Sequence, residues 1–186
     1  MVIIGITGTL GAGKGTVVEY LTAEKGFVHF SVRAFLLEEI RKRRLPENRD
    51  SMVVVANDLR QRHGSSYVTD CLYHRAAARG NDCIIESIRT PGEIASLRTK
   101  GTFILLAVDA DPKVRFSRIA LRGSETDHID YETFLANEAR EMTAADPAAQ
   151  NLQACIREAD YLLTNNGSRE ELFAQVEQVL HQVSKE

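Results

Sequence analysis

A glycine-rich string with a lysine close to its end lies near the start of the chain and could bind phosphate. Glycines let the backbone adopt positive φ and turn its amides toward phosphate oxygens, while a helix that starts at the string adds a positive dipole. The string follows an apolar run over 2–7 and precedes a helical pattern over 17–24, which is the context of a true P-loop. We therefore expect an ATP site in which Lys14 reaches the β- and γ-phosphates, made by Gly8, Thr9, Leu10, Gly11, Ala12, Gly13, Lys14, Gly15 and Thr16.

The residue directly after this lysine bears on the metal. P-loops usually place Ser or Thr there as a ligand of Mg²⁺, but this chain has Gly15, and Thr16 comes one residue later. We therefore expect Mg²⁺ to be held by phosphates and water. Glu86 ends a later apolar run, so its carboxylate is the candidate that orients a metal-bound water.

Three arginines recur along one predicted helix. Arg115, Arg118 and Arg122 are spaced i, i+3 and i+7, which places their guanidinium groups along one face. Phosphoryl transfer spreads negative charge over equatorial oxygens, and planar guanidinium groups with several donors match that charge. The alternative is a solvated helix face without a chemical role.

The elements that would position these residues follow a repeating pattern. Helical periodicity separates the apolar runs, and helix start signals stand at Thr90, with Glu93 three residues on, and at Ser168, with Glu171 three residues on. This alternation predicts an α/β, three-layer P-loop NTPase fold with a five-stranded parallel sheet, whose ligands lie beyond the carboxyl ends of the strands. The expected strands are 2–7, 27–31, 83–87, 103–108 and 161–164.

Two segments do not fit simple strand–helix units. Residues 32–80 contain three successive helical patterns, over 34–43, 51–63 and 67–79, and could form a helical substrate-binding arm. The polar break at about 123–130 could be a short lid. A chain of 186 residues without a visible linker predicts a single domain. Its core is expected over 1–31, 81–122 and 145–183.

Composition argues against several classes of partner. A formal net charge of -3 gives no broad basic field for nucleic acid, and the longest clean apolar run, 103–108, is too short to span a bilayer. We therefore expect a cytoplasmic protein with a small-molecule partner. The five histidines have no metal-ligand spacing, and the three cysteines are expected to be reduced and structural: Cys71, Cys83 and Cys155.

With these residues in view, the chain resembles a known family. The GKGT ending of the P-loop looks like adenylate kinase and its nucleoside monophosphate kinase relatives, and roughly residues 2–180 are similar to small adenylate-kinase-related or dephospho-CoA-kinase-like proteins. The resemblance rests on the P-loop, the arginines after the fourth strand, Glu86-Ser87-Ile88-Arg89-Thr90-Pro91, Ala159-Asp160-Tyr161 and Asn165 to Gly167.

This resemblance implies roles for particular residues. The matching stretch of adenylate kinases reads DGFPRT, with its arginine on the acceptor phosphate, which implies a catalytic and acceptor-binding role for Arg89. Glu86 stands at the Asp of that motif, and the resemblance places it at the substrate and, through water, at the metal. Arg118 and Arg122 match the arginines at the lid edge and are implied to be catalytic. Arg33 stands where the acceptor-binding arm begins.

The sequence favours an ATP-dependent nucleoside monophosphate kinase and leaves two alternatives. Dephospho-CoA kinases phosphorylate a hydroxyl group, and the resemblance implies that they have an aspartate just after the second strand to accept its proton. The corresponding stretch here, Ser31-Val32-Arg33-Ala34, contains no carboxylate. The other alternative is a non-catalytic nucleotide-sensing module partnered with an enzyme such as deoxycytidylate deaminase. The base and sugar of the acceptor and the oligomeric state stay open.

Overall fold

A parallel β-sheet with the P-loop strand at its centre organises the protein. The computed structural model describes residues 1–122, 129–143 and 150–183. The sheet has the order β2-β3-β1-β4-β5, and all its neighbouring strands are parallel. The predicted fold class is therefore confirmed, with the strands close to the expected ranges: β1 (Val2–Gly8), β2 (Val28–Ser31), β3 (Cys83–Glu86), β4 (Thr102–Asp109) and β5 (Tyr161–Thr164).

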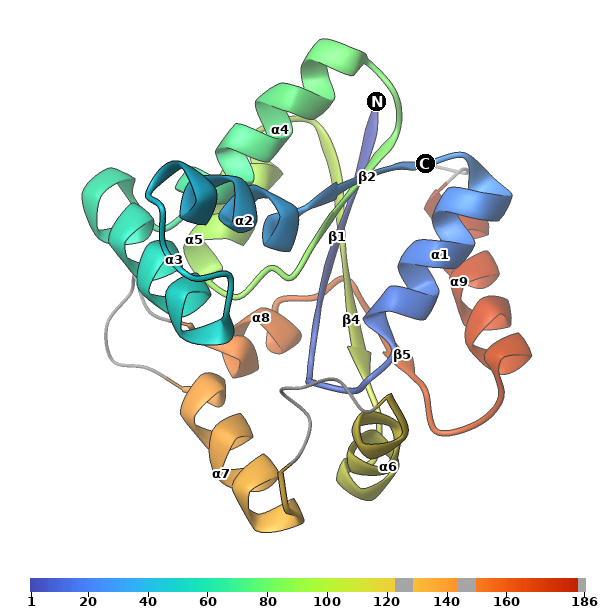
Figure 1. Cartoon of the computed structure of the whole chain (residues 1–186). Coiled ribbons are helices and arrows are strands. Elements are labelled where there is room, and N and C mark those ends of the chain that lie inside the picture. Colours follow the sequence, from blue (N-terminus) through green and yellow to red (C-terminus); the bar gives the residue numbers. More distant parts are fainter. Residues whose placement is uncertain (123–128, 144–149, 184–186) are drawn as a thin grey trace.

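Helices cover both faces of the sheet and make three layers (Figure 1). On one face, α1 (Lys14–Lys25) and α9 (Arg169–Val183) pack on a cluster that includes Ile4, Ile6 and Leu106. These strands are apolar throughout because a parallel strand with helices on both faces has no side that meets water. The opposite face is covered by α2 (Val32–Lys42), α3 (Arg49–His63), α4 (Tyr67–Arg79), α5 (Pro91–Arg98) and α8 (Leu152–Arg157).

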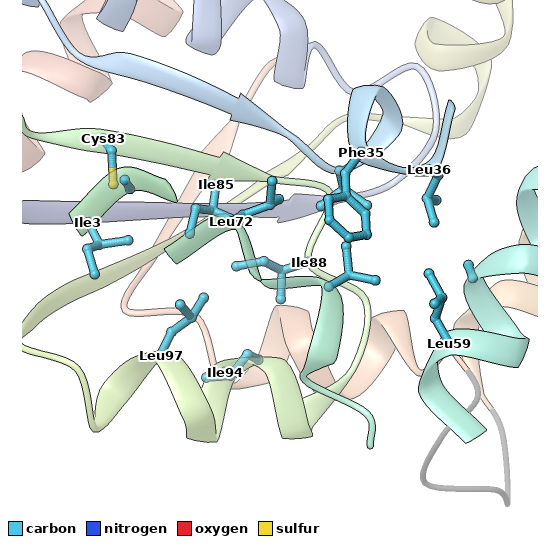
Figure 2. Close-up of a cluster of buried hydrophobic side chains, with 14 of the residues drawn as sticks. Ile3, Phe35, Leu36, Leu59, Leu72, Cys83, Ile85, Ile88, Ile94 and Leu97 are labelled. Carbon is cyan, nitrogen blue, oxygen red and sulfur yellow. The ribbon is translucent and has the colours of Figure 1, made fainter. Parts of the chain in front are cut away.

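The helices of the expected arm share the core of the sheet, since α2 and α4 pack on its strands and α3 packs on α2 and α4. Phe35 of α2, Leu59 of α3 and Leu72 of α4 belong to one buried cluster with Ile3 of β1 and Ile85 of β3 (Figure 2). The first two of these helices begin two residues before their predicted starts, and the third begins at its predicted start. The arm and the sheet therefore share one apolar core.

Two further helices, α6 (Pro112–Arg122) and α7 (Tyr131–Met142), lie near the end of β1 that carries the P-loop (Figure 1). The Asp130 side chain caps α7 by accepting a hydrogen bond from the backbone N–H of Thr133. Most of the predicted lid, 123–128, lies outside the described residues. Within the described ranges, no helix combines the length and apolar character that a membrane span requires.

Candidate functional site

The P-loop between β1 and α1 has the backbone that its glycines predict. Gly8 and Gly13 have φ values of 136° and 102°, in the region that favours glycine. A Cβ atom on Gly8 would overlap the carbonyl of Val108, and a Cβ atom on Gly13 would overlap the Asn165 amide. Glycine is therefore required at both positions for the loop to lie so close to its neighbours.

Three side chains from distant parts of the sequence hold the loop in place. The Thr9 hydroxyl donates to Asp109 Oδ1 at 2.6 Å, and Asn165 Nδ2 donates to the Ala12 carbonyl at 2.8 Å. Arg115 Nη1 donates to the Leu10 carbonyl at 3.3 Å. Sequence reasoning missed the anchoring roles of these three side chains. A signal existed for Asp109, which is the polar residue that ends the strand next to the P-loop strand.

Lys14, at the start of α1, has its ammonium group folded back onto the loop. Its Nζ donates to the carbonyls of Gly8 at 2.8 Å and Thr9 at 2.7 Å. The pKa of Lys14 is lowered to about 8. Desolvation is the main cause of this shift, the Arg89 guanidinium adds to it, and the Glu86 carboxylate opposes it. The ammonium group lacks strong anionic compensation here, so a bound phosphate would stabilise its charged form.

The residue after Lys14, Gly15, has open space beside its backbone. A Cβ on Gly15 would meet no atom within 4 Å. Glu86 lies at the end of β3, half-buried, where its carboxylate accepts from Ser31 Oγ at 3.3 Å and from Ser87 Oγ at 2.9 Å. Among the described residues, no group of three or more His, Cys, Asp or Glu side chains could hold a metal ion by itself. The Glu86 charge raises the pKa of Lys14, so this carboxylate lies near the P-loop lysine, and a metal ion here would need phosphate oxygens and water as further ligands.

Ser87 has the left-handed backbone conformation that favours glycine, the residue at this position of the adenylate kinase motif. Its φ is 64°, in the left-handed region, at the position where the DGFPRT motif has glycine. The conformation costs a non-glycine residue roughly 1–2 kcal/mol. The Ser87 hydroxyl bonds the adjacent Glu86 carboxylate, so the strained residue also orients the acid.

The turn that carries Arg89 is fixed by the predicted capping box. Glu93 Oε2 accepts from the backbone N–H groups of Arg89 at 2.7 Å and Thr90 at 2.9 Å, and Thr90 Oγ1 accepts from the Glu93 N–H at 3.2 Å. The Arg89 side chain donates from Nη1 to Glu141 Oε2 and to Gln150 Oε1, both at 2.8 Å. Because the Arg89 charge also acts on Lys14, the two cations lie near each other in the region between the P-loop and α7, called the crevice below, and Arg89 has a carboxylate of α7 as its partner.

The three arginines of α6 have different surroundings. Arg115 is buried, donates from Nε to the Ala110 carbonyl at 2.8 Å, pairs with Glu138 of α7, and lies 5.4 Å from the centre of the Phe134 ring. These contacts make Arg115 a clamp between the P-loop, α6 and α7.

The other sequence-predicted arginines are more accessible. Arg118 is half-buried, and its buried Nη1 has no hydrogen-bond partner among the described residues. Arg122 is exposed at the end of α6, and Arg33 is exposed in the first turn of α2. The structure thus brings together Lys14 and Arg89 with Glu86, and leaves Arg33 and Arg122 at the surface.

Comparisons with known proteins agree with this geometry. Residues 4–146 match the family model described as AAA domain. A similar relative is UPF0200 protein TK1334 of Thermococcus kodakarensis, 29% identical over 187 residues, with 97% of both chains covered. Similar solved structures are TT1252 from Thermus thermophilus (TM-score 0.63, 21% identity, 97% of both chains) and shikimate kinase from Bacteroides thetaiotaomicron (TM-score 0.60, 12% identity, 98% of both chains). The predicted likeness to small P-loop kinases is confirmed, and the acceptor is not identified.

The lowered pKa of Lys14 predicts that nucleotide binding depends on pH. Phosphate charge should raise the Lys14 pKa from about 8 in the free protein, so binding takes up a proton near pH 8. ATP affinity should therefore be nearly constant from pH 6.5 to 7 and fall as pH rises through 8, by at most about tenfold per pH unit. Calorimetry in buffers of different ionisation enthalpy measures both effects. Lys14→Met should bind weakly with a flat profile, and a flat wild-type profile up to pH 9.5 would contradict the prediction.

The buried contacts of Arg115 predict a large effect on stability. Arg115→Met leaves the Glu138 carboxylate and the Leu10 carbonyl without their partner, which should lower the free energy of unfolding by roughly 3 kcal/mol. Urea denaturation measures this loss. Lys113→Met, an exposed change on the same helix, should stay within about 0.5 kcal/mol of wild type. Adding Glu138→Gln to Arg115→Met should recover part of the loss, and a single variant as stable as wild type would rule out the clamp.

Proposed function

This chain belongs to the AAA domain family, and on that premise we propose that it is an ATP-dependent kinase whose acceptor is a ribo- or deoxynucleoside monophosphate. The observation that carries this proposal is that Lys14 and Arg89 lie near each other, beyond neighbouring strands of the sheet. Their strands, β1 and β3, are neighbours in the sheet, and the Arg89 charge acts directly on Lys14. Two cationic side chains at adjacent strand ends suit two phosphate groups, one on the donor and one on the acceptor.

The chemistry of such a transfer needs little from the protein beyond position and charge. An oxygen of the acceptor phosphate attacks the γ-phosphorus of ATP, the bond between that phosphorus and the β–γ bridging oxygen breaks, and ADP leaves. The attacking oxygen is already ionised at neutral pH, so no general base has to remove a proton. Alignment and neutralisation of charge supply most of the acceleration.

Each residue of the site has a role in this proposal. Lys14 and the loop amides bind the β- and γ-phosphates, and Glu86 would hold a water of the Mg²⁺ that comes with them, which would supply further positive charge. Arg118 and Arg122 approach the equatorial oxygens from α6. Arg33, at the start of the arm, contacts the acceptor phosphate together with Arg89. The proposed setting is the cytoplasm, with neither nucleic acid nor membrane as a partner.

A screen for transfer tests the proposal. The protein is incubated with ATP and Mg²⁺ against all ribo- and deoxynucleoside monophosphates and dephospho-CoA, and acceptor-dependent ADP formation is measured. Turnover with dephospho-CoA alone would identify a hydroxyl acceptor. ATP binding without transfer to any acceptor would identify a nucleotide-sensing module. Any turnover should fall at least about a hundredfold in Lys14→Met.

The role given to Arg89 predicts a selective loss of acceptor binding. Arg89→Lys keeps the positive charge but loses the planar fork that binds phosphate, so the acceptor KM should rise about tenfold, equivalent to about 1.4 kcal/mol. The KM for ATP should stay nearly unchanged. Steady-state kinetics with each substrate varied in turn measure this split, and Arg79→Lys, an exposed residue in the last turn of α4, is the matched control. A variant that weakens only ATP would place Arg89 in the donor site.

A further inference from the structure

Helix α7 presents two carboxylates to the cations beside the P-loop. Glu138 and Glu141 are spaced i, i+3, so they lie on one face of the helix. Glu138 pairs with Arg115, and Glu141 pairs with Arg89 at 2.8 Å. The space between the helix and the loop is small, since a void of about 10 Å³ is lined by Leu10, Asn137, Glu138, Glu141 and Leu152.

The two ion pairs differ in how easily a solute can replace them. The Arg115 side chain is 3% exposed and also binds backbone carbonyls, so its pair with Glu138 is part of the packed structure. The side chains of Arg89 and Glu141 are 28% and 25% exposed. An anion that enters the crevice from solvent can therefore compete for Arg89.

Glu141 lies near both cations to which the proposed function assigns the reacting phosphates. Its charge raises the pKa of Lys14, while the Arg89 charge lowers it, so the three groups act on one another within one crevice. In the proposed function, Arg89 binds the acceptor phosphate. Glu141 accepts from the same Nη1 atom that would serve that phosphate.

We propose that Glu141 is an internal anion that occupies the acceptor-phosphate position on Arg89 and sets the charge that an acceptor must carry, an inference that rests on the proposed function. A phosphate monoester at neutral pH brings up to two negative charges and several acceptor oxygens, so it replaces the single charge of Glu141 with a net gain near Arg89 and Lys14. A neutral alcohol brings no charge and leaves the ion pair intact. Glu141 thereby selects phosphate-bearing acceptors and keeps α7 against the crevice until one binds.

A binding experiment tests this inference without any transfer reaction. Inorganic phosphate is titrated into the protein saturated with MgADP, for wild type and for Glu141→Gln, which removes the competing charge and keeps the side-chain size. The phosphate Kd should fall at least about tenfold in Glu141→Gln, a change of about 1.4 kcal/mol. Glu132→Gln is the matched control, since Glu132 is exposed in the first turn of the same helix, and its Kd should stay within about twofold. In an Arg89→Met background, Glu141→Gln should have no effect on phosphate binding.

The inference fails if phosphate binds Glu141→Gln no better than wild type, because Glu141 would then hold Arg89 in position rather than compete for it. A second measurement uses the wild-type protein and covers the case of a variant that does not fold. Addition of phosphate to the MgADP complex should increase hydrogen exchange of the α7 amides, and unchanged or stronger protection would also overturn the inference. If the variant binds phosphate more tightly while the screen finds no acceptor, the proposed function fails and the role of Glu141 as a competing anion stands.

Discussion

The rest of the site depends on one constraint, which is that the ammonium group of Lys14 is held partly out of water. Taking a charge out of water is unfavourable unless dipoles or opposite charges replace the water. In this crevice the Gly8 and Thr9 carbonyls supply the dipoles, and Glu86 supplies an opposite charge, but Arg89 opposes them. The balance leaves Lys14 with a lowered pKa, which a bound polyanion would raise again. The strands and turns around Lys14 hold these groups in place beside its ammonium group.

The carboxyl ends of the parallel strands are where this arrangement becomes possible. β1 ends at the loop, β3 ends at Glu86, and β4 ends at Asp109, which accepts from Thr9. Because the strands are rigid and buried on both faces, each terminal side chain has a fixed place relative to Lys14. Helix α7 adds two carboxylates from outside the sheet, one to the buried Arg115 and one to the more accessible Arg89.

The parts of this architecture that depend on local sequence could be predicted, and the parts that depend on distant contacts could not. Apolar runs bounded by glycine and polar residues gave all five strands, and the spacing of Thr90 and Glu93 gave the cap that fixes the Arg89 turn. The i, i+3 spacing placed Arg115 and Arg118 along one helix but could not distinguish a buried clamp from a half-exposed side chain, because that depends on where α7 packs. The pair between Arg89 and Glu141 joins residues 52 positions apart, and no local pattern encodes it.

The anchoring of the P-loop has a consequence for the order in which the protein matures. The side chains that hold the loop come from positions 100, 105 and 153 residues further along the chain than the loop residues they bind. During synthesis the glycine-rich segment is therefore made well before Asn165, which follows Ala12 by 153 residues. The nascent chain therefore carries a loop whose amides are not yet fixed, and its competence to capture ATP arises late, when β5 and the turn after it have joined the sheet. A nucleotide that binds only the anchored loop would stabilise chains that include β5 over chains that still lack it.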